Sequence, residues 1–220
     1  MKGIIFDLDG TMVDNMMVHH RAWQQKLKEL GLDLTLEEVR QQIHGVNEEI
    51  LFRLFGDKYT AGERARFAWE KEESYRQIYK PSLQLIKGLP AFLQQLKQMD
   101  IPLGIGSAAP RENVDFVLDN LALRSYFKIT LHAGDVLKGK PDPEIYERVA
   151  GAMGVPVSGC LVFEDSPTGV EAALRAGSPV VVITTTHAQH EFAHFSNVIA
   201  FISDYTSPTL MSATREWVLS

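Results

Sequence analysis

The stretch Gly3-Ile4-Ile5-Phe6-Asp7-Leu8-Asp9-Gly10-Thr11 decides the fold that we expect for this chain. Its apolar half indicates a buried strand, and the strand ends at two carboxylates spaced i and i+2, which the Gly10 turn splays apart. In open α/β sheets, ligands bind just beyond the carboxyl ends of the strands. A buried pair of acids is costly without a partner, so Asp7 and Asp9 predict a bound cation. The alternative is an acidic turn that caps the following helix.

Five further short apolar runs have the length of strands, and segments with helical periodicity separate most of them. The runs lie at residues 101–106, 129–133, 160–164, 179–184 and 198–202. This alternation predicts an α/β fold with a mostly parallel sheet. One intervening helix is expected after Lys140, with Asp142 as its cap, Pro143 in its first turn and Gly154 at its end. A second helix is expected from Pro167 to Gly177.

Residues 15–80 have a different composition from the rest of the chain. They lack strand-like runs and are rich in Lys, Glu, Gln and Arg, with intermittent Leu, Trp and Phe, which indicates a helical insertion. Gly31 and Gly56 divide it into three or four helices. We therefore expect a core domain formed by residues 1–14 and 81–220, and a helical domain formed by residues 15–80.

Composition excludes several classes of protein. With 22 Lys and Arg and a net charge of −6, the 220 residues lack the excess of positive charge that is typical of nucleic-acid-binding proteins. An anionic substrate would therefore have to bind to a local cluster of positive charge or to a metal ion. The lone Cys160 rules out an internal disulfide or a cysteine cage. The first apolar run is too short for a signal peptide, and no stretch approaches the roughly 18 apolar residues of a membrane span. We expect a cytoplasmic protein without a membrane or nucleic-acid partner.

Three more polar elements follow predicted strands. A hydroxyl and freed backbone N–H groups at Ser107-Ala108 suit a phosphate oxygen. Lys140 belongs to a basic segment that two prolines, Pro141 and Pro143, fix just before a helix, and its ammonium can neutralise charge on a phosphoryl group. Glu164-Asp165 ends another buried strand, and Mg²⁺ prefers one or two carboxylates together with water and substrate oxygens. Each element alone has a simpler explanation, as a turn or cap residue or a solvated lysine.

Taken together, the four elements would meet along one edge of one sheet, and in their order they resemble the four motifs of the haloacid dehalogenase (HAD) superfamily. The resemblance spans nearly the whole chain. It implies a Rossmann-like core with a helical C1-type cap inserted after the first motif. The run Glu164-Asp165-Ser166-Pro167-Thr168-Gly169-Val170-Glu171-Ala172-Ala173 looks most like the subgroup of β-phosphoglucomutase and small sugar-phosphate phosphatases.

The resemblance implies a Mg²⁺-dependent phosphatase that acts on a small phosphomonoester, such as a sugar or polyol phosphate. Asp7 would attack phosphorus and form an aspartyl phosphate, and Asp9 would serve as general acid and base. The implied Mg²⁺ ligands are Asp7, the backbone carbonyl of Asp9, Asp165 and, directly or through water, Glu164. The implied phosphate-binding residues are Gly10, Thr11, Ser107, the Ala108 N–H and Lys140.

The cap bears on the choice between hydrolase and phosphomutase. The loop Gly45-Val46-Asn47-Glu48 aligns with a mutase loop that carries a phosphate-binding arginine, and Glu48 stands in place of that arginine. A carboxylate would repel a second phosphate, which disfavours a mutase. His19 aligns with a histidine that mutases use near the nucleophile, so a β-phosphoglucomutase-like mutase is the alternative. A catalytically silent HAD-like binding protein is the second alternative, and we expect a monomer or weak homodimer.

Overall fold

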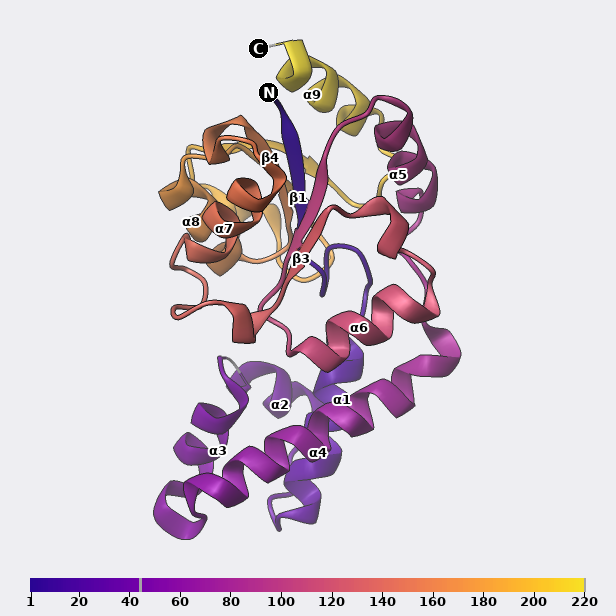
Figure 1. Ribbon diagram of the computed structural model, residues 1–220. Helices are drawn as coiled ribbons and strands as arrows, with labels where there is room; N and C mark the ends of the chain where they lie inside the picture. The colour runs from indigo at the N-terminus through magenta and orange to yellow at the C-terminus, as the bar shows by residue number, and fades with distance from the viewer. Residues whose placement is uncertain (44, 220) are drawn as a thin grey trace. The chain divides into compact units, whose positions relative to one another are not determined.

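The fold is that of a computed structural model, which describes residues 1–43 and 45–219 (Figure 1). The chain divides into two compact units. The first contains Met1–Asp14 and the chain from Gln84 onward, and the second is Asn15–Leu83. Among the described residues, no helix combines the length and apolar composition needed to span a bilayer.

A parallel sheet forms the centre of the first unit. The described part of the chain contains six strands, namely β1 (Gly3–Phe6), β2 (Leu103–Gly106), β3 (Ile129–Leu131), β4 (Cys160–Glu164), β5 (Val180–Ile183) and β6 (Val198–Ile202). Their order is β3-β2-β1-β4-β5-β6, and every neighbouring pair is parallel. Each strand lies within one of the predicted apolar runs, so the expected α/β fold with a Rossmann-like parallel sheet is confirmed.

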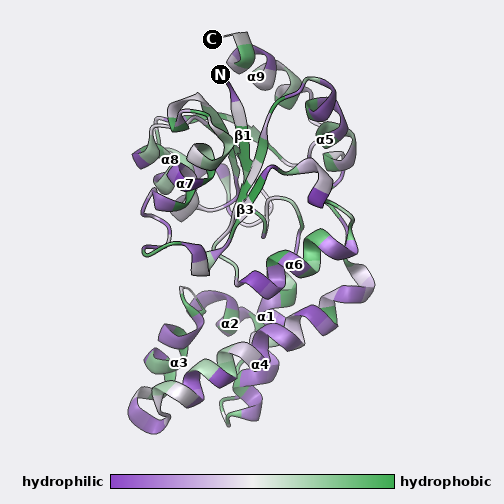
Figure 2. Cartoon of the chain, in the orientation of Figure 1, coloured by the Kyte–Doolittle hydropathy of each residue, from purple (hydrophilic) through white to green (hydrophobic). Residues whose placement is uncertain are grey.

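Helices cover both faces of this sheet. They are α5 (Leu89–Gln98), α6 (Arg111–Asn120), α7 (Glu144–Met153), α8 (Pro167–Ala176) and α9 (Pro208–Leu219). One face packs Ile5 and Val162 against buried side chains of α7 and α8, such as Val149 and Ala173. The opposite face carries an aromatic cluster in which Phe6, Phe163 and Tyr205 surround Phe92 of α5. Figure 2 accordingly shows the central strands as hydrophobic and the helices around them as mixtures of hydrophobic and hydrophilic residues.

The ends of α7 and α8 follow the sequence signals with one difference. Gly154 and Gly177 terminate the two helices in the left-handed conformation, as expected. The difference is at the start of α7, because Pro143 itself is the N-cap rather than a residue of the first turn. Asp142 still accepts a hydrogen bond, from the Glu144 N–H at 3.1 Å, so its side chain satisfies one of the free amides of the helix start.

The regular secondary structure described in the second unit is all helical, as the composition of the insertion predicts. It contains α1 (Met16–Glu29), α2 (Leu36–Gln42), α3 (Asn47–Phe55) and α4 (Ala61–Tyr79). Thr35 and Thr60 form capping boxes with the glutamates three residues later, which set where α2 and α4 begin. Trp23, Leu27 and Leu51 are among the residues of its own apolar core. Single 3-10 turns lie in this unit at Gly56–Lys58 and Lys80–Ser82. In the first unit they lie at Arg124–Tyr126, Ala133–Asp135, Val157–Gly159 and Gln189–Phe192.

The strand order has a direct consequence for ligand binding. The order of the sheet reverses between β1 and β4, and open α/β sheets bind their ligands at such a reversal, beyond the carboxyl ends of the strands. Asp7 directly follows β1, and Asp165 directly follows β4. The register pairs Phe6 with Phe163, which brings these two acids to the same edge.

Candidate active site

Asp7 is held where β1 ends and a tight turn begins. Its N–H donates to the Phe163 carbonyl at 3.0 Å, which continues the ladder between β1 and β4 by one residue. The chain then turns through Gly10, whose N–H donates to the Val13 carbonyl at 2.8 Å and whose φ is +74°. A side chain there would be strained by that φ, and its Cβ would lie 2.0 Å from Asp165 Oδ2. Glycine at this position therefore lets the turn approach the acid that follows β4.

Lys140 joins two of the predicted acids. Its Nζ donates to Asp7 Oδ1 at 2.6 Å and to Glu164 Oε1 at 2.7 Å. The same ammonium lies 4.9 Å from the centre of the Tyr146 ring, and the Tyr146 hydroxyl donates to Glu164 Oε1 at 2.8 Å. All four side chains are buried, so these charge-assisted hydrogen bonds are strong and their geometry is well defined.

The second oxygen of Glu164 is equally well satisfied. Glu164 Oε2 accepts hydrogen bonds from the Asp165 N–H at 2.9 Å, the Ser166 N–H at 2.9 Å and the Ser166 hydroxyl at 3.0 Å. The carboxylate thus has five donors over its two oxygens, at the N-terminus of α8, where the helix dipole also favours an anion. Its position is fixed by the protein itself.

The charges at this site are unbalanced. Burial raises the pKa of Asp7 to about 7, with Lys140 opposing the shift and Glu164 adding to it. Burial likewise raises the pKa of Asp165 well above its ordinary value, and the neighbouring carboxylates of Glu164 and Asp7 contribute. Burial acts in the same direction on Glu164, but contact with the Lys140 ammonium outweighs it and lowers that pKa. Three carboxylates around one ammonium leave an excess of buried negative charge, which a cation would neutralise.

The same three acids could ligate that cation. Asp7, Glu164 and Asp165 are buried, and each offers a carboxylate oxygen within 4.8 Å of the others. Oxygen donors of this kind suit a hard divalent cation such as Mg²⁺. The three carboxylates differ in how many hydrogen bonds from the protein they already accept. Glu164 has five donors, whereas among the described residues the Asp165 carboxylate accepts only from the Thr186 hydroxyl.

The other predicted core residues lie around this edge. Ser107 is buried just after β2, where the register pairs Phe6 with Ile105, and its hydroxyl accepts from the Ala109 N–H at 3.0 Å. Ala108 is exposed. The Thr11 hydroxyl is buried and has no hydrogen-bond partner among the described residues. A polar atom in that situation is expected to meet a ligand or water.

Sequence reasoning did not single out several residues that contact the site. Thr185 and Thr186 lie just after β5, and they donate hydroxyl hydrogen bonds to the Gly10 carbonyl and to Asp165 Oδ2. A signal was available, because these polar residues follow a predicted strand in the same way as the other motifs. Tyr205 donates to the Thr11 carbonyl at 3.0 Å from the segment after β6, and no local pattern announces that contact.

In the helical unit, His19 belongs to a buried polar network. Its Nδ1 lies 3.0 Å from the Lys71 Nζ, and its ring stacks on Tyr75 with the ring centres 3.8 Å apart. Burial lowers the pKa of His19 to about 3, and the Lys71 charge adds to the effect. Lys71 also donates to Glu72 at 2.7 Å, and Glu72 accepts from the Asn47 amide at 2.7 Å. The structure therefore links the two predicted residues His19 and Asn47 through Lys71 and Glu72, which the sequence did not reveal as partners.

The remaining predicted residues of the helical unit lie at the start of α3. Gly45 has a φ of +97°, Val46 is the N-cap, and Glu48 is exposed in the first turn. An acid in that turn interacts favourably with the helix dipole, which accounts for Glu48 without a ligand.

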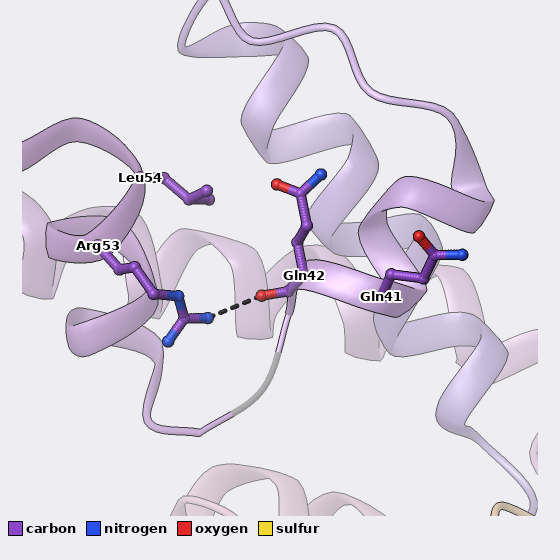
Figure 3. A pocket seen from close by; sticks show the side chains of 4 residues that line it. All are labelled: Gln41, Gln42, Arg53 and Leu54. Atoms are coloured by element: carbon purple, nitrogen blue, oxygen red, sulfur yellow. Dashed lines mark hydrogen bonds between the residues drawn. The ribbon is translucent and has the colours of Figure 1, made fainter.

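Arg53, near the other end of α3, lines a hollow of ≈ 490 Å³ together with Gln41, Gln42 and Leu54 (Figure 3). Its guanidinium donates to the Gln42 carbonyl at 2.7 Å, as the dashed line in Figure 3 shows. This hydrogen bond joins the Arg53 side chain to the backbone of its own unit.

Comparison with known proteins agrees with this geometry. The sequence profile of the family described as haloacid dehalogenase-like hydrolase matches residues 1–177. The phosphorylated carbohydrates phosphatase of Thermotoga maritima is 31% identical over 178 residues, which cover 80% of this chain and 82% of that protein. The β-phosphoglucomutase of Bacillus subtilis is 28% identical over 185 residues, or 80% of each chain. A HAD hydrolase of family IA, variant 3, from Entamoeba histolytica superposes with a TM-score of 0.89 over 100% of both chains at 25% identity.

Proposed function

This chain belongs to the haloacid dehalogenase-like hydrolases, and we propose that it is a Mg²⁺-dependent phosphatase that hydrolyses a small phosphomonoester. The observation that carries the proposal is the buried cluster in which Lys140 lies between Asp7 and Glu164, with Asp165 beside them. A buried surplus of carboxylates next to a fixed ammonium suits a transferred phosphoryl group and a divalent cation.

In the first half of the reaction, an Asp7 carboxylate oxygen attacks phosphorus in line. The bond between phosphorus and the ester oxygen breaks, and Asp9 gives its proton to the departing alkoxide. An aspartyl phosphate remains on Asp7. In the second half, Asp9 takes a proton from water as that water attacks phosphorus, the bond to Asp7 breaks, and inorganic phosphate leaves.

The other residues hold charge in place during these steps. Lys140 favours the ionised form of Asp7 through their 2.6 Å contact, against the effect of burial, and offsets negative charge on the phosphoryl oxygens. Glu164, with its five donors, mainly positions Lys140 and would meet a bound cation directly or through water. Gly10, Thr11, Ser107 and the Ala108 N–H bind the remaining phosphoryl oxygens.

A bound Mg²⁺ would be held by Asp7, Asp165 and the backbone carbonyl of Asp9. Its chemistry at this site is to screen the repulsion between the Asp7 carboxylate and the phosphate dianion. The fit of the site to a cation rests on the raised pKa values of Asp7 and Asp165, two buried acids that the protein alone does not fully compensate.

We assign catalysis to the domain formed by residues 1–14 and 81–220, and substrate selection to residues 15–80 acting as a cap. The substrate class that we propose is a sugar or polyol phosphate. A relative at 31% identity acts on phosphorylated carbohydrates, which supports this class. His19 and the segment Gly45–Glu48 would contribute to the cap's share of the site. Glu48 at the start of α3 brings a negative charge rather than a positive one, which favours hydrolysis over mutase chemistry. We propose a monomer or weak homodimer.

A phosphate-release screen over phosphorylated sugars, polyols and nucleotides, with Mg²⁺ present, tests this function. We expect release from sugar or polyol phosphates, loss of activity with EDTA, and recovery when Mg²⁺ is added in excess. Asp7→Asn should be inactive on every substrate. Full activity in metal-free buffer would contradict the mechanism, and rapid interconversion of glucose 1-phosphate and glucose 6-phosphate with little free phosphate would favour the mutase.

A further inference from the structure

The segment after β5 contacts the site at three points. Thr185 donates its hydroxyl to the Gly10 carbonyl at 2.5 Å, and Thr186 donates its hydroxyl to Asp165 Oδ2 at 2.5 Å. His187 Nδ1 lies 3.2 Å from the backbone carbonyl of Asp165. Two consecutive residues of one segment therefore hold both the side chain and the backbone of the same buried acid.

The Asp165 carboxylate depends on Thr186 to an unusual degree. Within the described part of the chain, the Thr186 hydroxyl is the one hydrogen-bond donor to this carboxylate, whereas the neighbouring Glu164 has five donors. Most buried carboxylates are oriented by several donors, because each oxygen can accept more than one hydrogen bond. Removal of one hydroxyl would thus leave the Asp165 carboxylate without a donor among the described residues.

The position of Oδ2 is also limited by the backbone. A Cβ on Gly10 would lie 2.0 Å from Asp165 Oδ2 and 2.8 Å from the Thr186 hydroxyl, so these three groups pack tightly together. With Oδ2 fixed between the hydroxyl and the Gly10 turn, the plane of the carboxylate is set, and Oδ1 is the oxygen left for a cation. Hydrogen-bond partners that orient a ligand in this way are a general feature of metal sites.

We propose that Thr186 is a positioning residue for the cation site, acting through its hydrogen bond to Asp165. The inference rests on the proposed function, because it concerns the cation that the phosphatase would bind. In this role Thr186 would act through Asp165 and would not itself be a ligand of the cation. Its effect should therefore appear first in the affinity for the cation, and only through that affinity in the rate.

The chain offers a matched control for the experiment. Thr184 is two residues earlier, and its hydroxyl donates to the Ile202 carbonyl at 3.3 Å, away from the acids. Thr186→Val removes the hydroxyl at nearly constant size, Thr186→Ser keeps a hydroxyl, and Thr184→Val removes one that does not reach the site. Binding of Mn²⁺ alone, measured by electron paramagnetic resonance without substrate, reports cation affinity directly. Thermal unfolding in EDTA reports folding independently of the cation.

We expect Thr186→Val to bind Mn²⁺ roughly 10- to 100-fold more weakly than the wild type, the usual loss when a partner of a metal ligand is removed. Thr186→Ser and Thr184→Val should bind close to the wild-type value and unfold in EDTA near the wild-type temperature. Thr186→Val should stay folded in EDTA but unfold at a somewhat lower temperature, because the buried Asp165 side chain loses its hydroxyl partner. Undiminished affinity in Thr186→Val, or an equal loss in Thr184→Val, would overturn the inference and leave the proposed function intact. Should Thr186→Val fold poorly, Thr186→Ser decides, because a large loss of affinity there would contradict a role for the hydroxyl. A wild-type protein that neither binds Mn²⁺ nor hydrolyses phosphomonoesters would refute the proposed function and this inference with it.

Discussion

Replacement of Gly169 by alanine would test how firmly the Glu164 carboxylate is held. Gly169 lies in the first turn of α8, and a Cβ there would be 1.6 Å from Glu164 Oε1 and 2.0 Å from its Cδ. Neither distance is possible between non-bonded atoms, so the carboxylate would have to move. Its displacement would break the contacts with Lys140 and Tyr146, which are among the five hydrogen bonds that hold it.

The cost follows from those contacts. Breaking a buried ion pair typically destabilises a protein by about 3–5 kcal/mol. Alanine in place of glycine within a helix returns up to about 1 kcal/mol. We therefore expect Gly169→Ala to lower the free energy of unfolding by about 2–4 kcal/mol, where helix propensity alone predicts a gain.

Urea unfolding of the variant, together with its rate of phosphate release, measures both consequences. Gly151→Ala is the matched control, because Gly151 is also helical and lies in α7. A methyl group on Gly151 would meet no other atom of the described residues within 4 Å, beyond its own helix backbone and chain neighbours. That control should be stabilised by up to about 1 kcal/mol and keep its activity. A Gly169→Ala protein as stable and as active as Gly151→Ala would refute the tight placement of Glu164.

Three further outcomes are expected. Lys140→Met should lower the free energy of unfolding at neutral pH by about 3–5 kcal/mol and nearly abolish phosphate release, because it leaves Asp7 without its ammonium; normal turnover would contradict this. Since burial raises the pKa of Asp7 from 3.8 to about 7, its contribution to the stability of the cation-free protein is complete below about pH 4 and is lost as the pH rises through about 7. As the pH is raised from about 4 to about 7 in EDTA, the melting temperature should therefore fall more for the wild type than for Asp7→Asn. An equal fall in the two proteins would count against the raised pKa of Asp7. Since burial lowers the pKa of His19 to about 3, its imidazole should be neutral at pH 5 in ¹⁵N NMR, with Nδ1 accepting from Lys71, and an imidazolium spectrum at that pH would disprove the assignment.

The fold was largely predictable because its strands are buried on both faces. A strand such as Val180–Ile183 is then apolar along its whole length, and such runs are visible in the sequence without any partner. Parallel strands also bring their carboxyl ends to one edge, so Asp7, Lys140 and Glu164 could be expected near one another from the sequence alone. The helical insertion was visible for the opposite reason, since it lacks such runs.

The individual contacts were less predictable, because each depends on geometry between distant parts of the chain. Glu164 was expected among the cation's ligands, and only the structure shows how many of its hydrogen-bonding positions the protein occupies. Thr186 carries no charge and matches no motif that we recognised. Its position just after a predicted strand was a signal that it lies at the same edge of the sheet, but its residue type does not reveal the contact with Asp165. Lys71 in the helical unit is similar, because a lysine in a helix rich in charged residues is usually solvated rather than buried against a histidine.

The central claim is that Asp7 carries the phosphoryl group during turnover. Asp9→Asn should slow the second half of the reaction most, so a sample of this variant quenched in acid during turnover of an activated aryl phosphate should accumulate the intermediate. Tandem mass spectrometry should then find one added phosphoryl group on the N-terminal peptide, located at Asp7, and none in a variant that also carries Asp7→Asn. A phosphoryl group on another residue, or equal labelling with and without Asp7, would contradict the account.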